Sequence, residues 1–279
     1  MTNFISKDLI GTFFPDPQMR QLYASAQVIH TLIAKETIFH LIAYISNYLK
    51  TQGTLQSLKV GIIGLGHIGT SILEEILHLQ ILSPEQVLVS TRTPDKHRKF
   101  IEQGLRVIWD NEQVAKECDF IILACLPHQI DSVCSSIRSI LSNKNKGIFT
   151  FTEEEKNPST MIFSILAATP IAKVKQLTDN YPFILRSYID VDLINKIIAS
   201  FPEEISPLSI CIENLPSHFA RTANDVRTFF EVFNAVFYGA QDIRDEIIEF
   251  FCGAVTEEGE YVSAFNNRFK EIMKEFGSI

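Results

Sequence analysis

The pattern of hydrophobic and polar positions divides the chain into three parts. Between residues 18 and 50, apolar residues recur at helical spacing, which predicts one or two amphipathic helices. From about residue 58 to 190, short apolar runs alternate with helical segments, as in a parallel sheet built from βαβ units. Beyond residue 190 the spacing is helical again and phenylalanine is frequent. We therefore predict an N-terminal helical extension at 1–57, a Rossmann-like, doubly wound α/β domain at 58–190 and a smaller helical domain at 191–279.

Short apolar runs in the middle part predict the strands of the sheet. The expected strands cover residues 59–63, 87–90, 105–109, 119–126, 161–166 and 183–186. Asp110 or Asn111 is available to cap a helix that starts after the third strand. A helix is expected at 128–141, a turn at 142–147, and a surface loop or an insertion at 148–160.

A glycine-rich turn joins the first strand to a helix. Residues 59–69 have the sequence KVGIIGLGHIG, which places G-x-G-x-x-G spacing between an apolar strand and a helical pattern. Gly64 permits the tight turn, Gly66 lets the backbone approach a pyrophosphate, and Gly69 lets the helix lie close to the strand. The helix N-terminus offers N–H groups and a positive dipole end to the anion. The predicted pyrophosphate contacts are Gly64, Leu65, Gly66, His67, Ile68 and Gly69.

The end of the second strand indicates which dinucleotide is bound. An NAD site needs an Asp or Glu there to accept hydrogen bonds from the ribose 2′-hydroxyl. This chain has hydroxyl and cationic side chains instead, and a guanidinium can donate two hydrogen bonds to a phosphate at once. We therefore predict NADP(H) as the cofactor; the alternative is that the cations are solvated turn charges. The predicted 2′-phosphate contacts are Ser90, Thr91, Arg92, Thr93 and Lys96.

The end of the fourth strand is predicted to lie near the nicotinamide, because ligands of such sheets bind outside the carboxyl ends of the strands. The residues expected there are Cys125, Leu126 and Pro127. His128 follows them, either as a proton donor or as a structural residue at a helix start. No catalytic residue is assigned from the sequence.

Composition narrows the function classes. The net charge is −8, so the chain lacks the basic footprint expected of a protein that binds nucleic acid or an anionic membrane. The five cysteines include no C-x-x-C pair and no metal-ligand spacing with histidine, so we expect free thiols in a reducing compartment and no metal site. With neither a signal-like N-terminus nor an apolar run long enough to span a bilayer, the expected location is the cytoplasm.

Three segments give the chain a resemblance to a known family. They are VGIIGLG at 60–66, VSTRTPDK at 89–96 and ACLPH at 124–128, and the similar region extends from residue 59 to about 140. In these segments the chain resembles the pyrroline-5-carboxylate reductases. The resemblance implies an NADPH-binding Rossmann domain, a helical C-terminal domain that forms a homodimer, and hydride transfer to a cyclic imine in proline biosynthesis.

The chain departs from that family mainly where the substrate would bind. His67 and Ile68 replace an Asn-Met pair, Leu126 replaces a lysine, and neither the Ser-Gly-Ser-Gly-Pro-Ala-Tyr loop nor the Pro-Gly-Gly-Thr segment is present. Thr256 lies in the nearest small-residue stretch, which matches too poorly to make it catalytic. We predict an oxidoreductase that reduces a C=N or C=O bond of a small metabolite. The alternatives are a catalytically silent nucleotide-binding or interaction protein, and an oxidoreductase with another substrate, such as a β-hydroxyacid or an F420-type partner.

Overall fold

The computed structural model describes residues 55–149, 160–166 and 169–187, together with individual positions between 16 and 48. The chain divides into two compact units. One unit consists of Thr54–Leu73 and Leu82–Ser187, and the other of Met1–Gly53, Glu74–Ile81 and Tyr188–Ile279. The predicted C-terminal helices and the homodimer assigned to them lie outside the described residues.

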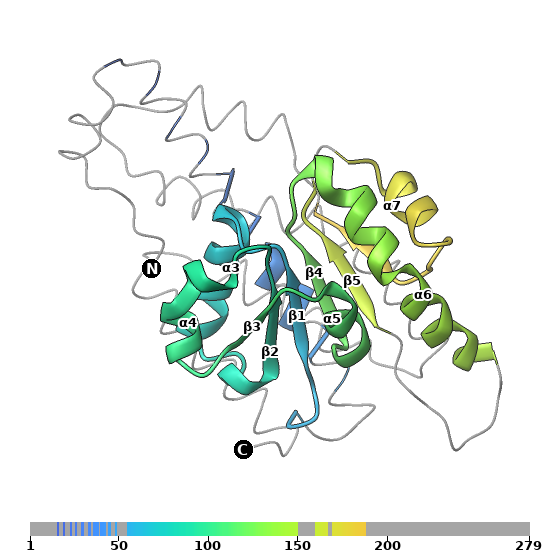
Figure 1. Cartoon of the computed structure of the whole chain (residues 1–279), viewed down its shortest axis with the longest axis horizontal. Helices are drawn as coiled ribbons and strands as arrows, with labels where there is room; N and C mark the ends of the chain where they lie inside the picture. Colours follow the sequence, from blue (N-terminus) through green and yellow to red (C-terminus); the bar gives the residue numbers. More distant parts are fainter. Residues whose placement is uncertain are drawn as a thin grey trace, which may run out of the picture. The chain divides into compact units, whose positions relative to one another are not determined.

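A six-stranded parallel sheet forms the centre of the first unit (Figure 1). The strand order is β3-β2-β1-β4-β5-β6, and every neighbouring pair is parallel. This is the order of a doubly wound Rossmann fold, so the predicted fold class is confirmed. The strands are β1 (Val60–Ile63), β2 (Val87–Ser90), β3 (Arg106–Ile108), β4 (Phe120–Leu123), β5 (Met161–Ser164) and β6 (Ile184–Arg186).

Burial along the strands follows from this order. Strands β1, β2, β4 and β5 are buried at every position, as expected for inner strands covered on both faces. The edge strands β3 and β6 have three residues each and are partly exposed. Stacked rings of Phe120 and Phe163 from the neighbouring strands β4 and β5 lie in the core, with centroids 6.5 Å apart.

Helices connect the strands in the order expected for βαβ units. Helices α5, α6 and α7 pack side by side against one face of the sheet (Figure 1). Asp110 is the N-cap of α5, because its carboxylate accepts hydrogen bonds from the backbone N–H groups of Glu112 at 2.8 Å and Gln113 at 3.3 Å. The α-helices are α3 (His67–His78), α4 (Arg98–Glu102), α5 (Asn111–Glu117), α6 (Ile130–Phe149) and α7 (Ile171–Leu177).

One predicted boundary is wrong. Helix α6 continues through residues 142–147, where the sequence predicts a turn, and includes the first two residues of the predicted loop at 148–160. The Lys144 ammonium donates hydrogen bonds to the Cys118 carbonyl at 3.2 Å and to the Thr160 hydroxyl at 2.7 Å. These tertiary contacts hold a polar segment of modest propensity in the helix. The rest of the predicted loop, 150–159, lies outside the described residues.

The described positions of the N-terminal extension agree with its predicted helical pattern. Every described position from 19 to 48 is helical. Its buried apolar residues include Ile38, Leu41 and Ile45. None of the helices in the described part of the chain is both long and apolar enough to cross a membrane.

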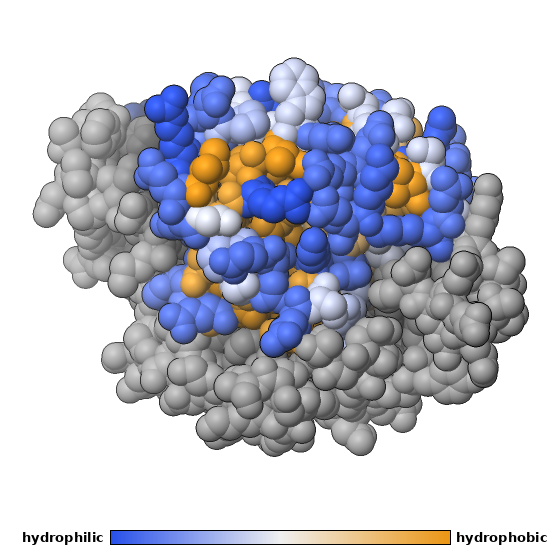
Figure 2. Space-filling view, turned by 60° about the horizontal axis from the view of Figure 1, so that its bottom comes forward, coloured by the Kyte–Doolittle hydropathy of each residue, from blue (hydrophilic) through white to orange (hydrophobic). Residues whose placement is uncertain are grey.

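Most of the described surface in Figure 2 is covered by hydrophilic side chains, with hydrophobic ones visible between them. Large apolar side chains that remain exposed are therefore informative about function where they lie near a candidate site. Among the described residues these are Met19, Ile101, Trp109 and Leu126.

Candidate functional site

The carboxyl ends of β1, β2 and β4 lie side by side at one end of the sheet. Ile63, the last residue of β1, is in register with Ser90 on one side and Leu123 on the other. The strand order changes direction here, because β2 and β4 lie on opposite sides of β1, and such switch points are where doubly wound sheets bind ligands. Backbone hydrogen bonds extend the pairing past the strand ends, from Gly64 N–H to Ser90 O at 2.9 Å and from Ala124 N–H to Ile63 O at 2.8 Å.

Two of the motif's three glycines are required by the fold itself. Gly64 has φ +102°, and a Cβ there would lie 2.7 Å from the Ala124 carbonyl oxygen. A Cβ on Gly69 would collide with the Gly64 carbonyl oxygen. Both contacts are with backbone, which cannot move aside cheaply. Gly64 therefore makes the turn, and Gly69 lets α3 lie directly on it.

Gly66 differs from the other two glycines. It is exposed, and among the described residues no atom beyond its two chain neighbours lies within 4 Å of the position that a Cβ would occupy. The fold would therefore accept a side chain at this position. Gly66 immediately precedes α3, so a side chain there would lie next to the first turn of this helix. That turn begins with the hydrogen bond from Thr70 N–H to Gly66 O at 2.8 Å and carries no acidic side chain, so its dipole end is suited to an anion.

The loop after β2 presents cationic and hydroxyl groups at the same edge. Arg92, Thr93 and Lys96 are exposed, and the Thr91 N–H donates to the Ile108 carbonyl at 2.9 Å, which ties the loop to the end of β3. Ser90 is buried, and its hydroxyl donates to the Asn111 side-chain oxygen at 2.7 Å. Ser90 thus lies beneath the loop, where it positions the start of α5.

In the segment after β4, Cys125 is buried and the three residues that follow it are exposed. Burial raises the pKa of the Cys125 thiol to about 11, so it is an uncharged apolar group and not a nucleophile. Leu126 is 55% exposed, and its N–H donates to the Gln129 side-chain oxygen at 3.3 Å. Pro127 starts the 3₁₀ turn Pro127–Gln129, and His128 within it is exposed.

Sequence reasoning missed two side chains that shape this edge. Asn111 holds Ser90, and Gln129 holds the Leu126 backbone. The signal for Gln129 was its place three residues after Leu126, the spacing at which a Gln side chain reaches back to the backbone at the start of a turn. Nothing local distinguished Asn111 from Asp110 as the capping residue.

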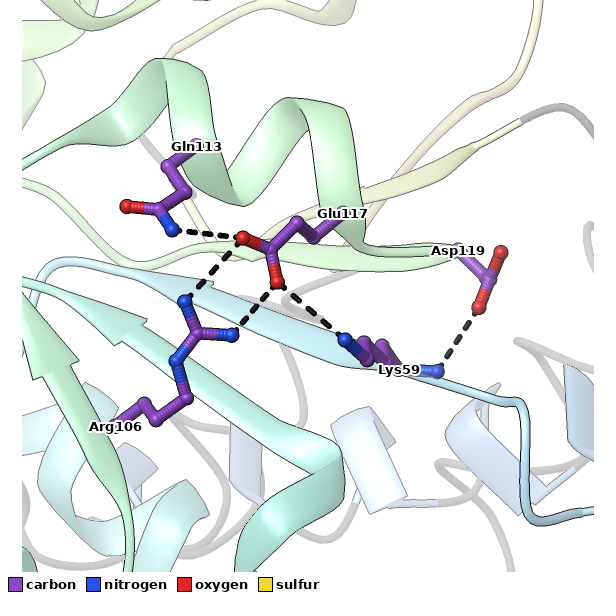
Figure 3. Close-up of polar contacts among 5 residues, drawn as sticks. All are labelled: Lys59, Arg106, Gln113, Glu117 and Asp119. Carbon is purple, nitrogen blue, oxygen red and sulfur yellow. Dashed lines mark hydrogen bonds and ion pairs between the residues drawn. The ribbon is translucent and has the colours of Figure 1, made fainter.

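A group of charged residues around Glu117 lies near the amino ends of the strands (Figure 3). Glu117, at the end of α5, accepts hydrogen bonds from Arg106 at 2.7 and 3.3 Å and from Gln113 at 2.7 Å, and pairs with the Lys59 ammonium at 3.4 Å. The Asp119 carboxylate accepts from the Lys59 N–H at 2.9 Å. Lys59, Arg106 and Asp119 all lie at the amino ends of strands, so this cluster fastens α5 to the sheet and is separate from the candidate site.

This cluster makes stability depend on pH. The Arg106 hydrogen bond, followed by that from Gln113, lowers the pKa of Glu117 from its usual 4.5 to about 2. A carboxyl group with a depressed pKa stabilises the fold above its unfolded-state pKa, and this contribution disappears as the pH falls from about 4.5 toward 2. Glu117→Gln is expected to remove about 1 kcal/mol of unfolding free energy at neutral pH and little at pH 2.

Urea unfolding at several pH values tests this prediction. The matched control is Glu112→Gln, since Glu112 is a more exposed carboxylate on the same helix and makes an i,i+4 pair with Lys116 at 3.7 Å. An equal loss of stability at both pH values for Glu117→Gln would show that the ion pair is not the cause.

The Rossmann domain of the chain is similar in sequence to known oxidoreductases. Residues 59–147 match the family model described as "NADP oxidoreductase coenzyme F420-dependent". The chain is 31% identical over 129 residues to NADP-dependent oxidoreductase domain-containing protein 1 of Mus musculus. The matching region covers 46% of this chain and 31% of the relative. It is also 31% identical over 136 residues to pyrroline-5-carboxylate reductase 3 of Xenopus laevis, covering 47% of this chain and 46% of that protein. This chain is similar to the pyrroline-5-carboxylate reductases. The resemblance predicted from the sequence is thereby confirmed.

The similarity has a limited extent. The chain spans about a third to a half of the length of these two relatives. A solved structure of Plasmodium falciparum pyrroline carboxylate reductase with NADP bound is 16% identical, covers 80% of this chain and 95% of that chain, and superposes with a TM-score of 0.37. Assignment of the fold therefore rests on the strand order and not on this superposition. The family model's description agrees with NADP(H), the cofactor predicted from the sequence.

Proposed function

We propose that the chain is an NADP(H)-dependent oxidoreductase similar to pyrroline-5-carboxylate reductase, which reduces a C=N or C=O bond of a small metabolite. The observation that carries the proposal is that Gly66 and Arg92, both exposed, follow the neighbouring strands β1 and β2 at the switch point of a Rossmann sheet. The family match over residues 59–147 supports the same cofactor class.

The residues present fit a dinucleotide phosphate. Gly66 leaves room for a pyrophosphate to approach the backbone, and the first turn of α3 provides N–H donors. Arg92 and Lys96 supply local positive charge for a 2′-phosphate in a chain of net charge −8. We assign Gly64, Leu65, Gly66, His67, Ile68 and Gly69 to the pyrophosphate and Thr91, Arg92, Thr93 and Lys96 to the 2′-phosphate.

The segment after β4 is assigned to the nicotinamide end. When bound, NADPH supplies the hydride. Cys125 and Leu126 would exclude water from one side of the ring, since the thiol is uncharged and the leucine is apolar. Ser90 acts indirectly, by holding the start of α5 beneath the loop after β2.

Turnover tests the proposal directly. We expect the full chain to oxidise NADPH in the presence of pyrroline-5-carboxylate, which is measured as the loss of absorbance of the reduced nicotinamide. The same reaction should be slower with NADH. NADPH binding with no turnover of this imine or of a panel of small ketones and imines would favour the catalytically silent scaffold. A chain that binds no NADPH would overturn the proposal altogether.

A further inference from the structure

An exposed tryptophan lies beside the candidate nucleotide site. Trp109 immediately follows β3, and its side chain is 76% exposed, the largest exposure among the large apolar side chains of the described residues. A tryptophan side chain ordinarily buries a large apolar area, so one directed into solvent is unfavourable unless something covers it. An exposed aromatic side chain beside a nucleotide site offers a flat face on which a base can stack.

The structure places Trp109 next to the loop after β2, which carries Arg92. The Thr91 N–H donates to the carbonyl of Ile108, the residue before Trp109, at 2.9 Å. Ile108 is also in register with Ser90 at the ends of β3 and β2. Neighbouring strands of a sheet are about 4.8 Å apart. Trp109 and the loop carrying Arg92 follow neighbouring strands, so their backbones begin about one strand spacing apart.

The order of the sites along the sheet edge identifies a ligand for Trp109. The pyrophosphate is assigned to the end of β1 and the 2′-phosphate to the end of β2. Continuing in the same direction, away from β4, the next strand end is that of β3. In NADP(H) the group attached to the ribose that carries the 2′-phosphate is the adenine, which is planar and aromatic.

We propose that Trp109 forms the stacking surface for the adenine of the bound nucleotide. The proposal rests on the proposed function, since it concerns the same cofactor. The adjacent Asp110 does not interfere, because its carboxylate is directed onto the first turn of α5, where it accepts from Glu112 N–H and Gln113 N–H. An indole face offers stacking without selecting a phosphate pattern, so Trp109 contributes affinity while Arg92 contributes selectivity for the phosphate.

Tryptophan fluorescence of the full chain tests this assignment, because Trp109 is its single tryptophan. Adenosine 2′,5′-bisphosphate, which has the adenine but no nicotinamide, is expected to quench the emission and to saturate at the Kd measured by calorimetry. Nicotinamide mononucleotide, which lacks the adenine, is expected to leave it unchanged. An emission that does not respond while calorimetry shows binding would overturn the stacking assignment and leave the proposed function standing.

Variants give a second measurement. Trp109→Leu is expected to weaken adenosine 2′,5′-bisphosphate binding roughly ten-fold, and Trp109→Phe much less, since the ring still stacks. Ile101→Ala is the matched control, because Ile101 is an exposed apolar residue on α4 and is expected to leave the affinity unchanged. Equal affinities for Trp109→Leu and the native chain would refute the stacking assignment. Failure of the native chain to bind either this nucleotide or NADPH would instead refute the proposed function.

Discussion

Gly69→Ala is expected to lower the free energy of unfolding by about 3 kcal/mol, because the added methyl group has no room. Its Cβ would meet the carbonyl oxygen of Gly64, and it would also approach the Ala124 Cβ to 3.3 Å. The first of these neighbours is backbone in a turn already fixed by Gly64 at φ +102°, so the helix itself has to move. Urea unfolding of the variant and the native chain measures the difference.

Gly66→Ala is the matched control for this prediction. Among the described residues, no atom beyond the two chain neighbours lies within 4 Å of its added Cβ, so stability should stay within about 0.5 kcal/mol of the native value. NADPH affinity should nevertheless fall roughly ten-fold, since the methyl group would occupy the space assigned to the pyrophosphate. The account of the glycine turn fails if Gly69→Ala is as stable as the native chain, or if Gly66→Ala binds NADPH normally.

Arg92→Ala is expected to weaken NADPH binding about thirty-fold and to leave NADH binding unchanged. A charge-assisted hydrogen bond contributes about 1.5–3 kcal/mol, and the guanidinium can donate two to one phosphate. NADH lacks the 2′-phosphate, so it has nothing to lose at this position. Calorimetric titration of the variant with each nucleotide gives both affinities.

Arg98→Ala provides the control for charge alone. Arg98 is also an exposed arginine and begins α4, six residues after Arg92, outside the loop that follows β2. Removing it changes the net charge by the same amount, so only a small, salt-sensitive loss of NADPH affinity is expected. A similar loss for both variants, or a parallel loss for NADH in Arg92→Ala, would place the 2′-phosphate elsewhere.

Local rules were sufficient to predict the fold class and which residues lie at the carboxyl ends of the strands. Continuous apolar runs identified β1 and β4 because inner parallel strands are buried on both faces. The glycine spacing predicted a tight turn, and in the structure a Cβ at Gly64 or Gly69 would collide with backbone atoms. Since the strands are parallel, their carboxyl ends lie at the same end of the sheet. The residues that follow the strands could therefore be predicted to lie near one another.

Features that depend on distant contacts could not be predicted in the same way. The end of α6 was placed too early because the bonds from Lys144 to Cys118 and Thr160 join segments far apart in the sequence. The direction of the Ser90 hydroxyl depends on Asn111, which comes from another element. The exposure of Trp109 was not visible either, since a tryptophan after an apolar strand is as consistent with burial as with exposure.

Calorimetric titration of the native chain with NADPH and with NADH tests the central claim most directly, because it requires neither a known substrate nor a variant. The account predicts saturable binding of NADPH at one site per chain, at least about ten-fold tighter than NADH. Equal or tighter binding of NADH would contradict the assignment of Arg92 to a 2′-phosphate, and binding of neither nucleotide would contradict the assignment of this sheet edge as a dinucleotide site.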